Sequence, residues 1–378
     1  YSKKHVIIFI FRCLMSHTEC GIVGLPNVGK SGLFNALTGA QVASCNYPFC
    51  TIDPNVGIVP VIDERLEALA KISNSQKIIY ADMKFVDIAG LVKGASDGAG
   101  LGNRFLSHIR ETHAIAHVVR CFDDPDVTHV SGKVNPVEDI EVINLELIFS
   151  DFSSAKNIHS KLEKLAKGKR EVGALLPLFD TIIAHLEKGL PLRTLELTPE
   201  QIVALKPYPF LTMKPMFYIA NVDESSLPDM DNDYVAAVRE VAAKENSKVV
   251  PICVRIEEEI VSLPIEERLE FLMSLGLEKS GLHRLVRAAY DTLGLISYFT
   301  TGPQESRAWT VVRGSSAWEA AGEIHTDIQK GFIRAEVITF EDMIECQGRA
   351  AARELGKLHI EGRDYIVQDG DTMLFLHN

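Results

Sequence analysis

The sequence predicts an α/β fold with a mostly parallel sheet, interrupted by a helical insertion and followed by a small α+β module. Three observations support this prediction. From residue 18 onward, short apolar runs alternate with helical stretches, which is typical of βαβ units. Between residues 138 and 206, apolar residues recur at helical spacing without a strand pattern. From about residue 298, short strand-like runs appear with turn signals such as Asp369-Gly370.

The elements of the main α/β domain follow one another in a regular order. Short apolar runs bounded by turn residues predict strands at 18–25, 55–61, 83–90, 114–122, 215–222 and 248–256. Helical periodicity predicts helices from Lys30 to Leu37 and at 102–112, 231–245, 264–275 and 281–293. We therefore assign the main domain to 15–137 and 207–297, a helical hairpin to 138–206 and the C-terminal module to 298–378.

The composition is ordinary for a globular protein in a reducing compartment. Hydrophobic residues make up 46% of the chain, and its seven cysteines form no CxxC pair, which argues against a disulfide framework or a zinc site. No apolar run reaches the ~18 residues that span a membrane, so we expect a cytoplasmic protein without a membrane partner. The net charge of −12 repels nucleic acid. We expect no DNA partner, and RNA contact only through a local basic patch.

The first residues need a separate interpretation. Residues 1–14 (YSKKHVIIFIFRCL) have the lysines and the short apolar stretch of a signal peptide. However, Arg12 interrupts the run and no small-residue cleavage site follows. We favour Met15 as the natural start and residues 1–14 as an upstream extension, with an exported protein as the alternative.

A phosphate-binding loop is the most specific motif in the chain. The string GLPNVGKS at 24–31 matches GxxxxGK[ST] and lies between an apolar strand and a helix, as the motif requires. Glycines let the backbone wrap phosphates, and the N–H groups at the helix start attract anions. Lys30 is expected to reach the β- and γ-phosphates and to act in catalysis, and the Ser31 hydroxyl to bind Mg²⁺. The expected nucleotide contacts are Asn27, Val28, Gly29, Lys30, Ser31 and Gly32.

Two further motifs indicate a switch hydrolase and not a metabolic kinase. Thr51, in PFCTI, is placed to sense the γ-phosphate and to complete the Mg²⁺ shell. Asp87-Ile88-Ala89-Gly90 ends a predicted strand and reads as DxxG. We expect Asp87 to hold Mg²⁺ through water and the Gly90 N–H to meet the γ-phosphate. The glycine-rich run that follows suits a second switch that reorders with the nucleotide.

The motif for the base departs from the usual NKxD of GTP-binding proteins. Here the strand is followed by Asn221-Val222-Asp223-Glu224, so valine replaces the lysine and the longer glutamate replaces the aspartate. Asn221 can donate to N7 and accept from an exocyclic amine, which suits adenine. We expect Asn221, Val222 and Glu224 to contact the base. The alternative is that NVDE is an ordinary turn after a strand.

The motifs together resemble one family. GLPNVGKSGLFNAL, NYPFCTI, DIAGLVKGAS, RCFDD, HVSGKVNP, YIANVDE and GFIRAEVI resemble the Obg-like ATPase (YchF) subfamily of translation-factor-related P-loop proteins, and the likeness extends from Thr18 to Phe375. The resemblance implies a P-loop domain, an inserted coiled-coil hairpin and a C-terminal TGS-like domain with a β-grasp fold. It also implies Mg²⁺-dependent ATP hydrolysis, with ATP preferred over GTP, and association with the ribosome.

The resemblance also implies the catalytic residue. Many switch GTPases orient the attacking water with a glutamine just after DxxG, but here that position is Leu91. The subfamily uses a histidine in the stretch that reads THVSGKVNP, which is His129. His129 follows a predicted strand, and ligands in such sheets bind beyond the carboxyl ends of strands. The alternative is that His129 is an ordinary loop residue.

Three positions depart from the family pattern or add to it. Gly32 replaces the usual threonine, so a hydroxyl is lost and the helix start is more flexible. Cys253-Val254-Arg255 lacks the small residues usual near the base. Asn27 suggests a K⁺ ligand, because related proteins with a hydrophobic residue after DxxG use an asparagine there. K⁺ stimulation is therefore a hypothesis.

The hairpin carries a cluster of cations on an acidic protein. Its members are Lys156, Lys161, Lys164, Lys167, Lys169 and Arg170. We expect this cluster to contact ribosomal RNA, with a solvated helix end as the alternative. The leading function is thus a ribosome-associated ATPase switch. The alternative is a ribosome-binding module that senses ATP with negligible hydrolysis.

Overall fold

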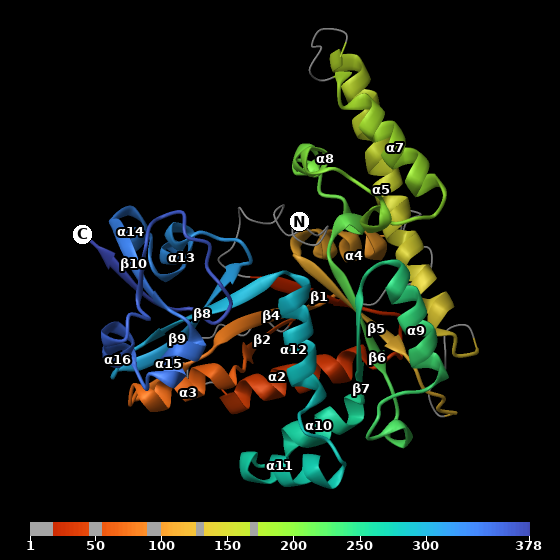
Figure 1. The fold of residues 1–378 in the computed structure, drawn as a ribbon. Coiled ribbons are helices and arrows are strands. Elements are labelled where there is room, and N and C mark those ends of the chain that lie inside the picture. The colour runs from red at the N-terminus through yellow and green to blue at the C-terminus, as the bar shows by residue number, and fades with distance from the viewer. Residues whose placement is uncertain (1–17, 45–54, 89–99, 126–131, 167–172) are drawn as a thin grey trace. The chain divides into compact units, whose positions relative to one another are not determined.

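The computed structural model describes residues 18–44, 55–88, 100–125, 132–166 and 173–378 (Figure 1). Three predicted site residues, Thr51, Gly90 and His129, lie outside these ranges, as do Met15 and the hairpin cations Lys167, Lys169 and Arg170. Contacts divide the chain into two compact units, which are described separately. The larger contains Thr18–Val59 and Lys84–Thr292, and the smaller contains Pro60–Met83 and Leu293–Asn378. No described helix combines the length and apolar composition needed to cross a bilayer.

The larger unit is built on a six-stranded sheet in the order β2-β4-β1-β5-β6-β7. Its strands are β1 (Glu19–Val23), β2 (Val56–Val61), β4 (Ala81–Asp87), β5 (Ala114–Arg120), β6 (Met216–Asn221) and β7 (Lys248–Ile252). The pairs β1–β4, β1–β5, β5–β6 and β6–β7 are all parallel. Strands β5 and β6 are buried along their whole length, which explains their nearly continuous apolar sequence. The predicted α/β class is confirmed.

Helices connect and cover these strands. They are α2 (Lys30–Ser44), α4 (Gly100–Glu111), α9 (Asp233–Lys244), α10 (Val254–Ser262), α11 (Ile265–Ser274) and α12 (Gly281–Thr292). Helix α9 begins after Asn232, whose side chain accepts a hydrogen bond from the Val235 N–H. It packs on β6 and β7, α12 packs on β7, and α10 lies along α2. The connections therefore follow the alternation of strands and helices in the sequence.

One predicted strand is shorter than expected. Residues 254–256 were expected to end the strand that begins at 248, but β7 ends at Ile252 and α10 begins at Val254. Cys253 has extended backbone between the two elements. The Val254 N–H donates to the Asn221 side chain, 33 residues away in sequence. Periodicity cannot reveal such a distant contact, so the helix start was missed.

The helical insertion is confirmed and is more than a simple hairpin. It contains α5 (Pro136–Ala166), α7 (Leu176–Glu187), η2 (Leu192–Thr194), α8 (Pro199–Leu205) and η3 (Leu211–Met213). Helices α5 and α7 lie side by side (Figure 1) around a core that includes Ala155, Leu162, Phe179 and Ile182. The apolar residues at helical spacing in the sequence are those that fill this core.

One polar cluster ties α5 to η3 within the insertion, and a second fastens the insertion to the main domain. Asp151 of α5 accepts hydrogen bonds from the Leu211 N–H (2.8 Å) and the Thr212 N–H (2.7 Å). Arg193 of η2 forms an ion pair with Glu245 (2.9 Å), and the Tyr218 hydroxyl of β6 donates to the same carboxylate (2.7 Å). The side chains of Arg193 and Glu245 are nearly buried. Removing either partner would leave a buried charge uncompensated.

The smaller unit is built on a second six-stranded sheet, in the order β11-β10-β12-β8-β9-β3. Its elements are α3 (Glu64–Ile72), β3 (Lys77–Ile79), β8 (Leu295–Thr301), β9 (Glu305–Val312), α13 (Ala317–Ile324), α14 (Thr326–Lys330), β10 (Phe332–Ile338), α15 (Phe340–Glu345), α16 (Arg349–Glu354), β11 (His359–Glu361) and β12 (Thr372–His377). Strand β8 pairs antiparallel with β9 and parallel with β12, and β12 pairs antiparallel with β10. Helix α13 follows β9 and packs on this sheet, as the predicted β-grasp fold requires.

Residues 60–83 belong by their contacts to this smaller unit, whereas the sequence placed them in the main domain. Strand β3 pairs in parallel with β9. Arg65 of α3 forms ion pairs with Asp63 (2.7 Å) and with Asp369 (3.1 Å), which is 304 residues away in sequence. Partners this distant leave no local signal, so the sequence pattern did not reveal the grouping.

Candidate functional site

The loop between β1 and α2 has the backbone that a phosphate-binding loop needs. Strand β1 ends at the buried Val23, and α2 begins at Lys30. Asn27 and Gly29 have positive φ angles of 62° and 93°. A Cβ at Gly29 would lie 2.2 Å from the Asn221 Nδ2 atom, and one at Gly24 would lie 2.8 Å from a carbonyl oxygen of β5. Close contacts therefore require glycine at both positions, and at Gly29 the positive φ requires it as well.

Lys30 and Asp87 meet where two adjacent parallel strands end. In the β1–β4 pairing, Asp87 lies opposite Ile22, directly before the loop. The Lys30 Nζ atom forms an ion pair with Asp87 Oδ1, and both side chains are mostly buried, with 11% and 22% exposed. Ser31, in the first turn of α2, is exposed. The structure thus brings Lys30 and Asp87 together, and Ser31 follows Lys30 in the chain.

Asn221 links the phosphate loop to the start of α10. Its amide nitrogen donates to the Val28 carbonyl (2.9 Å), and its amide oxygen accepts from the Val254 N–H (3.1 Å). The residue is buried, with 4% of its surface exposed. Both ends of the amide therefore bond within the protein. The predicted contact of Asn221 with a base stays a prediction.

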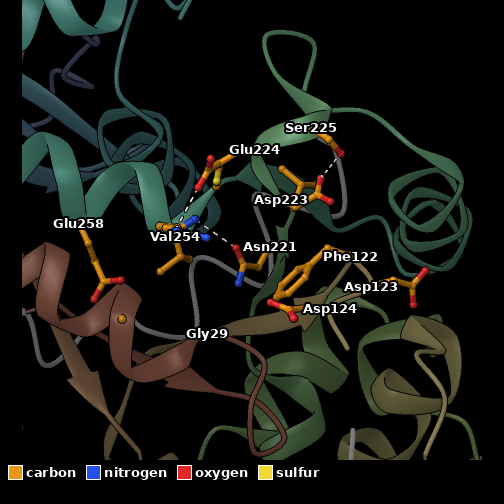
Figure 2. Close-up of a pocket in the computed structure, with 14 residues that line it drawn as sticks. Gly29, Phe122, Asp123, Asp124, Asn221, Asp223, Glu224, Ser225, Val254 and Glu258 are labelled. Carbon is orange, nitrogen blue, oxygen red and sulfur yellow. Dashed lines mark hydrogen bonds and ion pairs between the residues drawn. The ribbon is translucent and has the colours of Figure 1, made fainter. Parts of the chain in front are cut away.

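A pocket of about 640 Å³ opens beside this link (Figure 2). Its walls come from the phosphate loop, the loop after β5, the loop after β6 and the first turns of α10. It is lined by Gly29, Gly32, Phe122, Asp123, Asp124, Asn221, Val222, Asp223, Glu224, Ser225, Cys253, Val254, Arg255 and Glu258. The predicted residues Gly29, Gly32, Asn221, Val222 and Glu224 thus share one pocket. Its size suits a small organic ligand.

The loop after β5 is held in place by Arg120, which is 1% exposed. Its guanidinium donates to the Phe122 carbonyl (3.1 Å) and the Asp124 carbonyl (3.2 Å). The same group lies 4.7 Å from the centre of the Phe122 ring. These contacts order the loop, so the Phe122 ring is a fixed part of the pocket wall.

The charges in the pocket are mostly negative. Five carboxylates line it, from Asp123, Asp124, Asp223, Glu224 and Glu258. Arg255 is the only lysine or arginine among the lining residues, and its Nε atom lies 3.1 Å from Glu224 Oε1. Figure 2 shows Glu224 on the loop after β6, at the wall of the pocket. A ligand group that donates hydrogen bonds is favoured here over an anionic one.

Sequence reasoning missed part of this pocket. Phe122 and the two aspartates after it follow a buried strand, so the rule that ligands bind beyond strand ends could have found them. The family pattern placed Val254 and Arg255 near the base, but it did not reveal that they begin the helix α10, which also brings in Glu258. Burial raises the pKa of the Cys253 thiol above its usual value, which keeps this pocket residue protonated.

A strand–loop–helix with a lysine at the helix start, an acidic partner on the adjacent strand and a pocket beside them define a P-loop nucleotide-binding protein. Comparison with known proteins agrees. Residues 19–150 match the family model described as "50S ribosome-binding GTPase". Residues 295–378 match the YchF GTPase C-terminal family model, described as "Protein of unknown function (DUF933)".

Full-length relatives identify the family. The chain is 54% identical over 361 residues to the "Ribosome-binding ATPase YchF" of Haemophilus influenzae, covering 95% of this chain and 99% of that protein. It is 51% identical over 360 residues to the protein of the same name in Bacillus subtilis, covering 95% and 98%. The solved structure of the Schizosaccharomyces pombe YchF GTPase is 33% identical with a TM-score of 0.88, covering 97% and 99%. The chain therefore belongs to the YchF family.

Proposed function

We propose that this protein is a Mg²⁺-dependent ATPase that prefers ATP over GTP, switches conformation with its nucleotide and associates with the ribosome in the cytoplasm. The observation that carries the proposal is the phosphate loop joined by Asn221 to an adjoining pocket. A phosphate chain and a base can then be held at one site. The relatives named "Ribosome-binding ATPase YchF" support both the reaction and the partner.

The phosphates are proposed to bind at the start of α2. The N–H groups of residues 27–32 and the positive end of the helix favour anions there. Lys30 is the cation at this point, and its present partner is Asp87. When a triphosphate binds, we expect Lys30 to turn to the β- and γ-phosphates, because these carry more negative charge than one carboxylate. Lys30 then stabilises the charge that develops during hydrolysis.

Mg²⁺ is proposed to bind between Ser31 and Asp87. Their hydroxyl and carboxylate oxygens are ligands that a hard cation prefers. Ser31 lies in the first turn of α2, and Asp87 ends β4, the strand next to β1. Bound Mg²⁺ would neutralise charge on the β- and γ-phosphates. Thr51 is proposed as a further ligand and Gly90 as a γ-phosphate contact. K⁺ binding at Asn27, whose φ is 62°, is a separate hypothesis that turnover in K⁺ versus Na⁺ tests.

The preference for ATP over GTP is proposed from the base side of the pocket. A carboxylate that reads guanine must accept hydrogen bonds from N1 and the amino group. Here Glu224 is paired with Arg255, and Val222 is buried in place of the usual lysine. Phe122 offers a ring face against which a base can stack. The carboxylates nearby can accept from the exocyclic amine of adenine.

His129 is proposed to orient the attacking water. The residue after DxxG is Leu91, which cannot hydrogen-bond, so a polar group from another segment is needed. His129 follows the loop that forms the pocket wall after β5. His129→Ala should lower kcat by about 10²–10⁴-fold, the usual contribution of one proton-transfer group, and leave the Kd for ATP unchanged. Single-turnover hydrolysis at equal ATP saturation measures this, and an unchanged rate would remove His129 from the mechanism.

Ribosome contact is proposed for the insertion. Lys156, Lys161 and Lys164 are all exposed near the end of α5. The Lys156 Nζ atom also lies 4.1 Å from the centre of the Phe152 ring. Cations grouped on an otherwise acidic protein are suited to a phosphate backbone, and such contacts weaken steeply with salt.

One experiment separates the leading function from the alternative. ATP and GTP are titrated against the purified protein, and phosphate release is then measured with and without ribosomes. We expect tighter binding of ATP than of GTP, and turnover that requires Mg²⁺. Binding without phosphate release under either condition would favour the alternative, a ribosome-binding module that only senses ATP. Release of phosphate from GTP faster than from ATP would contradict the proposed base preference.

A further inference from the structure

Helix α10 comes so close to Gly32 that a side chain at this position would have to displace a neighbour by a few tenths of an ångström. A Cβ built on Gly32 would lie 3.0 Å from Val254 Cγ1 and 3.0 Å from Glu258 Oε2. Both distances are shorter than an ordinary van der Waals contact. In Figure 2 the Glu258 side chain points from α10 toward the start of α2. Glu258 is exposed and can move its carboxylate, so the fixed obstacle is Val254.

Val254 is held where it lies by a hydrogen bond and by burial. Its N–H is bonded to the Asn221 amide oxygen at 3.1 Å, and the residue is 4% exposed. Its second methyl group, Cγ2, lies 3.7 Å from the position that a Cβ at Gly29 would occupy. A β-branched side chain in a helix has one strongly preferred χ1 rotamer, so turning this side chain aside is unfavourable. The valine therefore fills the space between the two glycines.

We propose that Gly32 and Val254 are a matched pair and that Val254 is a positioning residue for nucleotide binding. The valine sets the separation between the phosphate loop and the loops that hold the base, and Gly32 leaves the room it needs. A threonine at position 32 requires a smaller residue at position 254. This inference rests on the proposed function, since it concerns a ligand that spans both halves of the site.

The pair makes an unusual prediction for Gly32→Ala. Glycine within a helix normally disfavours folding relative to alanine, so the replacement usually stabilises an exposed helix. Here the added methyl group meets Val254, and overpacking a fixed contact is destabilising. The melting temperature should therefore fall for Gly32→Ala alone. In the Val254→Ala background the same replacement should raise the melting temperature, so the double variant should melt higher than Val254→Ala alone.

The decisive test measures two ligands on the full chain, ATP and inorganic tripolyphosphate. Tripolyphosphate can contact only the phosphate loop, whereas ATP also places its base in the adjoining pocket. Gly32→Thr should raise the Kd for ATP about tenfold or more, the scale of one overpacked contact, and change the Kd for tripolyphosphate much less. Adding Val254→Ala to Gly32→Thr should restore most of the ATP affinity, because the smaller side chain at position 254 leaves space for the threonine.

Gly39→Ala is the matched control. A Cβ at Gly39 would lie 2.5 Å from Val261 Cγ1, in the same pair of helices but away from the pocket lining. This variant should lower the melting temperature and leave the Kd for ATP unchanged. The proposal is overturned if Gly32→Thr binds ATP as the parent does, if Val254→Ala gives no recovery, or if Gly39→Ala weakens ATP binding equally. A parent protein that binds neither ligand would refute the proposed function itself.

Discussion

Replacing Asn221 with alanine should destabilise the protein even before any nucleotide is added. The side chain joins the Val28 carbonyl and the Val254 N–H through hydrogen bonds of 2.9 and 3.1 Å, and it is 4% exposed. Alanine would leave both backbone groups without their partner. A buried polar group that loses its partner costs about 1–3 kcal/mol. Partial entry of water lowers the sum, so we expect a loss of roughly 2–4 kcal/mol in the free energy of unfolding.

Urea unfolding without nucleotide measures this loss, as a lower midpoint at unchanged slope. Glu224→Gln is the control from the same motif. Its pairing with Arg255 is exposed, so it should change the unfolding free energy by no more than about 0.5 kcal/mol. If Asn221→Ala changed stability as little as Glu224→Gln does, the link between phosphate loop and α10 would not hold the site together. Asn221 would then serve the nucleotide alone.

Three further predictions address the phosphates, the insertion and pH. Lys30→Ala should abolish detectable ATP binding in a titration with a fluorescent ATP analogue. Binding and cleavage of ATP as in the parent protein would refute the assignment of this loop to phosphate binding. Replacing Lys156, Lys161 and Lys164 together with alanine should weaken ribosome co-sedimentation and flatten its salt dependence, whereas the exposed Lys330→Ala should do neither. Burial lowers the pKa of His117 to about 3, and its ring nitrogens have no hydrogen-bond partner among the described residues. The unfolded state therefore takes up the proton first, and stability falls by about 1.4 kcal/mol per pH unit from near pH 6.5 toward pH 3. His117→Phe should remove this part of the acid destabilisation in urea melts from pH 7 to pH 4, and an unchanged pH profile would contradict it.

The sequence alone was sufficient to predict those features that depend on residues close together in the chain. The string from Gly24 to Ser31, the alternation of strands and helices and the helical spacing after residue 138 each lie within a short window. Backbone geometry requires glycine and lysine at fixed spacing around phosphates, so the loop could be recognised before its structure was known. The resemblance then supplied the β-grasp module, whose strands are individually short and ambiguous.

Tertiary structure decided the features that join distant segments. Periodicity predicted a strand to residue 256, but α10 begins at Val254, whose N–H donates to the Asn221 side chain. That helix brings Arg255 and Glu258 into the pocket and places Val254 against Gly32. The sequence marked Gly32 as an expected nucleotide contact and as a departure from the family pattern. The reason it must be glycine is a contact across more than two hundred residues, and such contacts depend on how whole elements pack, which no local pattern encodes.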